Sequence, residues 1–385
     1  MPDITIMIAA RNASQTIERT LRSVQKSGNW PILLIDDYSD DDTVKIAKET
    51  YGHALSIVRP EIRKNIGTVR DAGLAAVEGD YALWLDADDE ILPGRVEAML
   101  QVMEAQNADF VYGNTQLISG ETGEHIKDLN IPDFLKHPNG YVRQIERNWI
   151  QGIGWPMLRL ATVKPLGYDR NLFHGEDYDI LLRGIMAGLK VSFAENAGHL
   201  YYDYPTSLSR NLDESLNFLP AILGRFSERA YCQTLGEAGL IDRDQLLSLV
   251  STSLFKQDFV WTEKLLSDLE SHDFGNEISD SYKVKKQWLA DFYRGTLALV
   301  KGQFEHAIQL YNSMRQTEDD CELFNNLAVA YDALGQQALA KDLLKRAIDA
   351  KPNYADAVFN CKNGNPKRIT YHLLRREKSR DNYQI

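Results

Sequence analysis

The sequence is poor in cysteine and has no long apolar run. Its 385 residues include three cysteines, Cys232, Cys321 and Cys361, which cannot form a disulfide framework and lack the Cys-x-x-Cys spacing of a metal site. The N-terminus has no positively charged stretch leading into an apolar one, so we expect no signal peptide. No stretch approaches the roughly 18–20 apolar residues of a spanning helix. We therefore expect a protein of the reducing cytoplasm whose membrane contact, if any, is peripheral.

Positive charge is also in deficit. The chain has 43 Lys and Arg against 55 Asp and Glu, a net charge of −12, which argues against nucleic acid as a partner of the whole molecule. Hydrophobic residues make up 44% and charged residues 25%, as in ordinary globular proteins, which excludes a disordered or collagen-like chain. At about 100–200 residues per domain, the length predicts two or three domains.

The first hundred or so residues alternate between short β-rich runs and segments with helical spacing. The apolar runs are 4–8, 32–35, 55–58 and 81–85. Continuous apolar strands separated by helices predict a parallel sheet with helices on both faces. Because ligands bind beyond the carboxyl ends of such strands, the loops at 9–12, 36–43 and 86–90 are the candidate site.

From about Leu212 onward the β pattern disappears and helical spacing takes over. Small residues recur at an offset of 33, which suggests a repeat. The segment 324–352 resembles a tetratricopeptide repeat at eight positions: Phe324, Leu327, Ala328, Tyr331, Gly335, Ala340, Ala347 and Pro352. Residues 288–314 match less well, since Arg294 stands at a normally apolar position. The alternative is an ordinary helical hairpin whose small residues allow close packing.

The last two dozen residues reverse the overall charge. Residues 362–380 carry seven Lys and Arg and one acid, Glu377. One interpretation is a solvated, frayed C-terminus. The other is a patch that settles on anionic lipid, where each basic residue near the surface contributes about 1 kcal/mol.

Two acidic loops follow predicted strands. Asp86, Asp88 and Asp89 end the fourth strand, and clustered carboxylates repel one another unless a cation such as Mg²⁺ or Mn²⁺ neutralises them. A solvated acidic turn is the alternative, and an EF-hand is disfavoured because Ile91 stands where that loop needs glycine. Asp37 follows the second strand, where it is placed to accept a hydrogen bond from a base or a ribose.

Five segments in order resemble the motifs of family-two inverting glycosyltransferases with the GT-A fold. They are AARN (9–12), IDDYSDDDT (35–43), NIGTVRDAGL (65–74), LDADD (85–89) and HGEDYDILLR (174–183). The resemblance covers about residues 1–210 and implies an α/β, Rossmann-like, mostly parallel sheet, followed by an all-α tetratricopeptide-like part. We therefore expect a catalytic domain over 1–212, a helical connector over 213–285, repeats over 286–361 and a basic tail over 362–385.

The resemblance also implies roles for individual residues. It implies that the nucleotide-sugar donor is bound by Ala10, Arg11, Asn12, Asp37, Gly67, Arg70 and Asp86. Asp88 would bind a Mn²⁺ or Mg²⁺ ion. The acceptor would be bound by Trp155, His174 and Glu176. Asp177 becomes the general base of a single inverting displacement. Glu176 and Asp177 also suit a helix N-terminus, where acids favour the dipole. Trp155 suits the core equally well.

Two positions depart from the family pattern. Asp71 replaces the usual asparagine, and we expect Lys64 or Arg63 to compensate its charge. Tyr204 replaces a histidine that often binds the metal or the diphosphate. His199 is either its substitute or an ordinary hydrogen-bonded histidine.

The predicted function is the metal-dependent transfer of a sugar from a nucleotide sugar to a glycan or lipid-linked oligosaccharide. Asp37 favours uridine as the nucleotide. The reaction would belong to bacterial surface polysaccharide synthesis at the inner face of the cell membrane. In one alternative, the helical repeats bind a polypeptide acceptor. Others are a haloacid-dehalogenase-like phosphatase, disfavoured because Asp86 lies on the fourth strand, and a non-catalytic protein with a degenerate sugar-nucleotide site. The repeats are also candidates for binding a second copy or another protein.

Overall fold

The computed structural model describes residues 2–146, 148–150, 154–205, 218–239, 242–271, 280–314, 320–352, 354–364 and 366–371. The chain divides into two compact units. The first comprises Met1–Gln144 with Asn148–Ile222, and the second Ile145–Arg147 with Leu223–Ile385. The finer division expected from the sequence, at residues 212, 285 and 361, stays a prediction.

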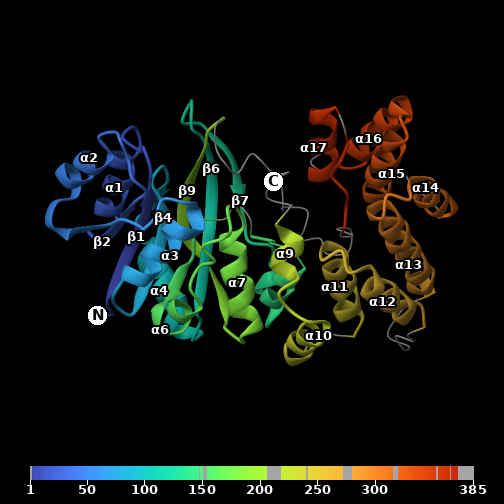
Figure 1. Ribbon diagram of the computed structural model, residues 1–385, viewed down its shortest axis with the longest axis horizontal. Coiled ribbons are helices and arrows are strands. Elements are labelled where there is room, and N and C mark those ends of the chain that lie inside the picture. The colour runs from blue at the N-terminus through green and yellow to red at the C-terminus, as the bar shows by residue number, and fades with distance from the viewer. Residues whose placement is uncertain are drawn as a thin grey trace. The chain divides into compact units, whose positions relative to one another are not determined.

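A single mixed sheet lies at the centre of the first unit (Figure 1). Over the described residues its strands are β1 (Ile4–Ala10), β2 (Ile32–Asp36), β3 (Leu55–Val58), β4 (Tyr81–Asp86), β5 (Glu90–Ile91), β6 (Phe110–Ser119), β7 (His125–Leu129), β8 (Met157–Arg159) and β9 (Val191–Asp203). Their order is β3-β2-β1-β4-β8-β6-β9-β5, with β7 paired to β6. The four predicted apolar runs are thus β1 to β4.

The direction of the strands changes across this sheet. β1 to β4 are parallel, as predicted, and the register pairs Ala10 with Asp36 and Ala9 with Asp86. The carboxyl ends of β1, β2 and β4 therefore meet at one edge. Beyond β4 the sheet is mixed, because β8 is antiparallel to both β4 and β6, whereas β6 and β9 are parallel. A strand as short as β8 has no local pattern that sets its direction.

Helices cover both faces of the parallel strands. Over the described residues, the helices of the first unit are α1 (Ile17–Lys26), α2 (Thr43–Tyr51), α3 (Ile66–Ala76), α4 (Arg95–Ala105), α5 (Asp133–Lys136), α6 (Leu160–Val163) and α7 (Glu176–Met186). The short helix α9 (Leu219–Leu223) includes the boundary between the units, which lies after Ile222. Buried residues of α1, α2 and α4 share one core with the alternate side chains of β1. On the other face, a Cβ on Gly73 of α3 would lie 2.8 Å from the Trp84 ring and 2.9 Å from Ile35. That glycine lets α3 approach the sheet closely and positions its site residues.

The second unit is helical, as predicted. It contains α10 (Glu228–Glu237), α11 (Asp242–Phe255), α12 (Phe259–Ser271), α13 (Asp280–Val300), α14 (Phe304–Ser313), α15 (Cys321–Ala333), α16 (Gln337–Ala350) and α17 (Ala355–Asn363). Gly302 and Gly335, with φ angles of 73° and 76°, make the turns between α13 and α14 and between α15 and α16. Arg294 is accommodated on α13 because Glu270 of α12 lies 2.6 Å from its Nε. The tetratricopeptide identity of these helix pairs stays a prediction.

The predicted basic tail is partly built into the second unit. Lys362 belongs to α17, and Arg368 is only 9% exposed and forms an ion pair with Asp356. A solvated tail or a lipid-binding patch is therefore the wrong description of residues 366–371. Residues 372–385 lie outside the described residues. Among the helices that the structure describes, none is both long and apolar enough to cross a membrane.

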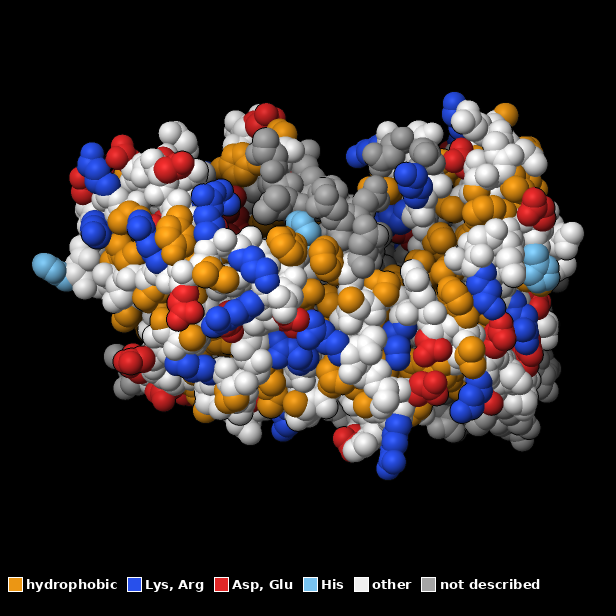
Figure 2. All heavy atoms as spheres, in the orientation of Figure 1, with side chains coloured by type: hydrophobic (Ala, Val, Ile, Leu, Met, Phe, Trp, Pro, Cys, Tyr) orange, Lys and Arg blue, Asp and Glu red, His pale blue; other side chains and the backbone are white. Residues whose placement is uncertain are grey.

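The surface charge agrees with the composition. On the face drawn in Figure 2, basic side chains are interspersed with acidic and apolar ones over the described residues.

Candidate functional site

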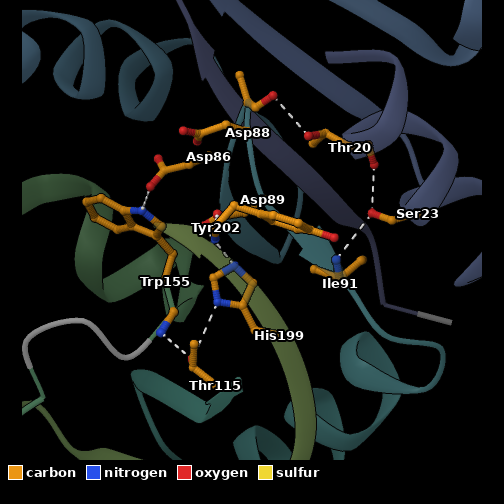
Figure 3. A network of polar contacts seen from close by, with 12 residues as sticks. Thr20, Ser23, Asp86, Asp88, Asp89, Ile91, Thr115, Trp155, His199 and Tyr202 are labelled. Atoms are coloured by element: carbon orange, nitrogen blue, oxygen red, sulfur yellow. Dashed lines mark hydrogen bonds and ion pairs between the residues drawn. The ribbon is translucent and has the colours of Figure 1, made fainter. Parts of the chain in front are cut away.

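The site is built around Asp86, the last residue of β4. Arg70 Nη2 lies 2.5 Å from Asp86 Oδ1, and Trp155 Nε1 donates a hydrogen bond of 2.7 Å to Asp86 Oδ2. Figure 3 shows the indole of Trp155 turned toward this carboxylate. Both oxygens of Asp86 are thus held by side chains from two other segments, which fixes the orientation of the carboxylate.

Arg70, on α3, is the cation of the site. Its guanidinium carbon lies 4.4 Å from the centre of the Trp84 ring and 3.8 Å from that of Trp155. The residue is 2% exposed, and among the described residues its Nε and Nη1 have no hydrogen-bond partner. A buried charge with unpaired donors is costly, so these N–H groups suit an anionic ligand such as a diphosphate.

Asp88 stands beside this pair with a raised pKa. Burial, and then the charges of Asp89 and Asp86, raise the pKa of Asp88 to about 7. A cation that shares the carboxylate would restore its charged form. Among the described residues, no group of three or more His, Cys, Asp or Glu side chains is arranged to hold a metal. The residues therefore fit Mn²⁺ or Mg²⁺ only if a ligand's phosphate oxygens complete the coordination, a common arrangement for Mg²⁺.

Asp89 contacts His199, as the dashed line in Figure 3 shows. It is fully buried, accepts a hydrogen bond of 3.0 Å from the Tyr202 N–H, and lies 3.1 Å from His199 Nε2. Burial and the nearby Arg95 lower the pKa of His199 to about 3, so the imidazole is neutral. His199 therefore has the partners of a hydrogen-bonded histidine, and its alternative role as a substitute ligand stays a prediction.

Thr115 links this histidine to the segment that carries Trp155. Its Oγ1 lies 3.4 Å from His199 Nδ1 and accepts a hydrogen bond of 2.7 Å from the Gly154 N–H. The neutral histidine therefore supports, through a hydroxyl, the backbone next to the indole that binds Asp86.

Glu176 and Asp177 open helix α7. Burial, and then the charge of Asp177, raise the pKa of Glu176 to about 8, and burial raises that of Asp177 as well. Arg70 lowers and Asp86 raises both values, so the four groups are close enough to act on one another. The position of Glu176 and Asp177 is therefore compatible both with stabilising the helix N-terminus and with acting as a catalytic pair.

The first two loops meet at the ends of β1 and β2. The Asp37 N–H donates to the Ala10 carbonyl at 2.9 Å, and Arg11 Nη1 lies 3.8 Å from Asp37 Oδ2. Burial raises the pKa of Asp37, while Arg11 opposes the shift. Asp37 Oδ1 is buried and has no hydrogen-bond partner among the described residues, so it is available to a ligand's N–H or hydroxyl group.

Asn12 has a structural task that the sequence did not reveal. It adopts a left-handed backbone conformation with φ 49°. Its Oδ1 accepts a hydrogen bond of 3.0 Å from the Asp40 N–H, and its own N–H donates to Ser39 Oγ at 3.0 Å. Asn12 thus binds the first loop to the second and holds Asp37 in place.

Two further predicted site residues, Gly67 and His174, have structural neighbours of their own, and their donor and acceptor roles stay predictions. A Cβ on Gly67 would lie 2.4 Å from the Asp169 carbonyl oxygen, so this glycine serves close packing of backbone against backbone. His174 directly precedes Gly175, the N-cap residue of α7, and the centre of its ring lies 5.9 Å from that of Phe218.

The expected compensation of Asp71 was wrong. Asp71 Oδ2 lies 2.6 Å from Arg170 Nε, and its Oδ1 accepts a hydrogen bond of 2.9 Å from the Tyr168 N–H. Lys64 instead donates to Asn171. Asp71 is therefore turned away from Arg70, toward a segment about a hundred residues further along the chain.

Arg19 and Trp84, which no sequence motif singles out, complete the site. Arg19 of α1 donates to the Asp88 carbonyl at 2.5 Å and to the Tyr204 hydroxyl at 3.3 Å. Trp84 has the appearance of an ordinary core residue in an apolar strand but forms one wall of the Arg70 site. No local pattern in the sequence separates either of them from its neighbours.

Comparison with known proteins identifies relatives of this arrangement. The family model described as "Glycosyl transferase family 2" matches residues 5–167. The chain is 24% identical to succinoglycan biosynthesis protein ExoO of Rhizobium meliloti, over 64% of this chain and 72% of that protein. It is 25% identical to the Escherichia coli "UDP-Glc:alpha-D-GlcNAc-diphosphoundecaprenol beta-1,3-glucosyltransferase WfgD", over 58% and 87%.

A solved structure resembles nearly the whole chain. The crystal structure of S. aureus TarS 1–349 in complex with UDP-GlcNAc matches with a TM-score of 0.50 and 14% identity, over 94% of this chain and 92% of that one. At this level of identity the likeness concerns the fold alone. It agrees with the mixed sheet and flanking helices of the GT-A fold and with the helical region that follows.

Proposed function

We propose that this chain, whose residues 5–167 match the family model of glycosyl transferase family 2, moves a sugar from a uridine diphosphate sugar to a glycan or lipid-linked oligosaccharide. The reaction inverts the anomeric centre and serves the synthesis of a bacterial surface polysaccharide. The observation that carries this proposal is the convergence of Asp86, Arg70 and Asp177 from β4, α3 and α7.

The relatives guide the choice of donor and acceptor. The name of WfgD specifies a UDP-glucose donor and a diphosphoundecaprenol-linked acceptor, and the TarS structure contains UDP-GlcNAc. ExoO is named for the biosynthesis of succinoglycan. These names support a uridine nucleotide and a glycan or lipid-linked acceptor for this chain, and the open oxygen of Asp37 suits a uracil N–H.

The donor site follows from the geometry at the ends of the strands. Asp37 and Arg11 would lie at the base, Asp86 at the ribose, and the free N–H groups of Arg70 at the diphosphate. Mn²⁺ or Mg²⁺ held by Asp88 and phosphate oxygens would supply further positive charge at the leaving group. Arg70 stabilises the charge that develops on the departing nucleoside diphosphate, and burial strengthens this effect.

Asp177 performs the proton transfer. Its carboxylate accepts the proton of the acceptor hydroxyl while the hydroxyl oxygen forms a bond to the anomeric carbon. The bond from that carbon to the diphosphate oxygen breaks on the opposite face, and its electron pair leaves with the nucleoside diphosphate. A raised pKa makes Asp177 a stronger base than an ordinary aspartate. One displacement therefore inverts the configuration.

A thermal-shift screen tests this proposal. Uridine, guanosine and thymidine diphosphate sugars are compared with and without Mn²⁺ or Mg²⁺. We expect a uridine diphosphate sugar with metal to give the largest rise in Tm. A ligand present at a hundredfold excess over its Kd stabilises the folded protein by about 2.7 kcal/mol, which is large enough to measure. Asp88→Asn is expected to remove the metal-dependent part of the rise, whereas Asp128→Asn, at an exposed strand position, is the control. A larger rise in Tm with a guanosine or thymidine diphosphate sugar would refute the uridine donor. A rise that metal does not increase would refute the metal site.

Glu176 gives the activity an alkaline limit. Its pKa of about 8 means that the carboxyl is neutral below pH 8 and charged above it. The added negative charge beside Asp177 disfavours an anionic donor. We expect kcat/KM for the donor to fall about tenfold per pH unit above this transition in the wild type. Glu176→Gln stays neutral, so its pH profile is expected to remain level there. Identical alkaline limbs in the two proteins would contradict this role.

A further inference from the structure

Residues 366–371 lie in a groove of the second unit and are held there by asparagine side chains. In Figure 1 they continue from α17 at the red end of the chain. The asparagines are Asn325 and Asn326 of α15 and Asn360 of α17, and all three are fully buried. Their amide groups bind mainly the backbone of the segment.

The contacts are bidentate and recur at every second residue. Asn360 Oδ1 accepts from the N–H of Arg368 at 2.8 Å, and its Nδ2 donates to the carbonyl of the same residue at 2.9 Å. Asn326 Oδ1 accepts from the Thr370 N–H at 2.7 Å, and its Nδ2 donates to the Thr370 carbonyl at 3.0 Å. Asn325 adds a bond of 2.9 Å to the Arg368 carbonyl. A period of two is that of an extended chain.

These asparagines depend on the segment. A buried amide that loses its partner pays the full cost of its desolvation. Because backbone groups are the same in every polypeptide, such contacts accept any extended chain without a proline at the bonded N–H positions. The groove is thus built to recognise a peptide backbone.

Side-chain contacts supply the selectivity of the groove. Arg368 Nε lies 2.8 Å from Asp356 Oδ1, and Thr370 Oγ1 donates a hydrogen bond of 2.9 Å to Asp356 Oδ2. The ring of Tyr371 lies 4.3 Å from that of Phe255 on α11. One aspartate therefore selects an arginine and a hydroxyl two residues apart, and a ring receives the aromatic side chain that follows.

The groove continues beyond the resident segment. A cavity of about 350 Å³ begins at Pro366, and its apolar lining includes Ala340, Leu344 and Ile348 of α16. The described part of the chain's own segment leaves this volume open. A longer extended peptide has room there for one apolar side chain.

We propose that this groove is a binding site for an extended segment of a partner protein with the pattern arginine, any residue, threonine, aromatic, and that residues 366–371 close it in the absence of that partner. A tethered segment competes at an effective concentration of about millimolar. The partner must therefore bind more tightly than an isolated copy of the chain's own sequence, for instance by filling the cavity beside Pro366. This inference concerns the helical unit and does not depend on the proposed transferase function.

The test uses the full chain and a fluorescein-labelled peptide with the sequence of residues 364–373. Arg368→Ala with Thr370→Ala removes the side-chain contacts of the resident segment with Asp356. We expect the labelled peptide to bind this double variant at least ten times more tightly than the wild type in fluorescence anisotropy. Lys367→Ala, at an exposed position of the same segment, is the matched control and is expected to behave as the wild type.

Three further results decide the proposal. A peptide with the same two alanine substitutions is expected to bind the double variant at least tenfold more weakly, and equal binding would refute the selectivity. Absence of peptide binding to a double variant with native circular dichroism would refute the groove as a binding site. Concentration-dependent dimers with exchanged segments, seen by light scattering, would show that a second copy is the occupant and would overturn the partner proposal.

A second experiment tests the proposal if the double variant does not fold. A protease site is inserted between Gly364 and Asn365 of the otherwise unchanged chain, and the folded protein is cleaved. Replacement of the resident segment by the labelled peptide would support the proposal. Retention of the cleaved segment against a large excess of peptide would overturn it.

Discussion

Asp177→Asn is expected to lower the rate of sugar transfer by roughly 10²–10⁴-fold, the usual contribution of general-base assistance. Asparagine keeps the shape of the side chain and can still accept a hydrogen bond from the Tyr178 N–H, which lies 2.7 Å from Asp177 Oδ1. It cannot accept the acceptor's proton. The measurements are turnover with a uridine diphosphate sugar and the Kd for the donor, which we expect to change by less than a few-fold.

The control for this variant addresses the helix dipole. Asp177 stands in the first turn of α7, and loss of an acid from such a position costs about 0.3–1 kcal/mol of stability without affecting chemistry. Asp133→Asn removes an acid from the first turn of α5 and should leave turnover unchanged. Turnover of Asp177→Asn within a few-fold of the wild type would assign that residue to the helix alone.

Arg70→Ala is expected to lower kcat by roughly 10²–10³-fold, the effect of removing one donor that stabilises transition-state charge. It also breaks the bond of 2.5 Å to Asp86, and we expect the free energy of unfolding to fall by about 1.5–3 kcal/mol. Arg70→Lys keeps the charge but loses the planar group between Trp84 and Trp155, so its kcat should lie between those of the alanine variant and the wild type. Steady-state kinetics and urea unfolding measure the two effects.

The same substitution predicts a shift in pH dependence. Arg70 lowers the pKa of Asp177, so its removal raises that pKa further. The acid limb of the kcat profile should then move to higher pH, because Asp177 must be ionised to act as a base. Arg170→Ala, which removes an exposed cation from Asp71, is the control and should leave the profile unchanged. An acid limb that does not move would mean that Arg70 acts on the donor alone.

The N-terminal half of the fold was largely predictable from local pattern. The runs that became β1, β2 and β4 consist mostly of buried apolar residues, and the acids that follow β2 and β4 stand at strand ends wherever such a sheet forms. Asp37 and Asp86 were therefore placed correctly at one edge. Asn12 and Gly67 also have structural tasks that local pattern did not reveal, set by their neighbours in space, Asp40 and the Asp169 carbonyl, and their place at the donor stays a prediction.

The sequence by itself determined the strand runs, the helical second unit and the carboxylates at the ends of the strands, because these depend on neighbours a few positions away. Tertiary structure alone decided that Arg70 lies between two tryptophans, that Trp155 holds Asp86 across 69 positions of the chain, and that asparagines of α15 hold a segment 43–45 residues further along. Such contacts form only when the whole core packs. Their partners are set by burial and hydrogen-bond satisfaction, which no local periodicity of the sequence records.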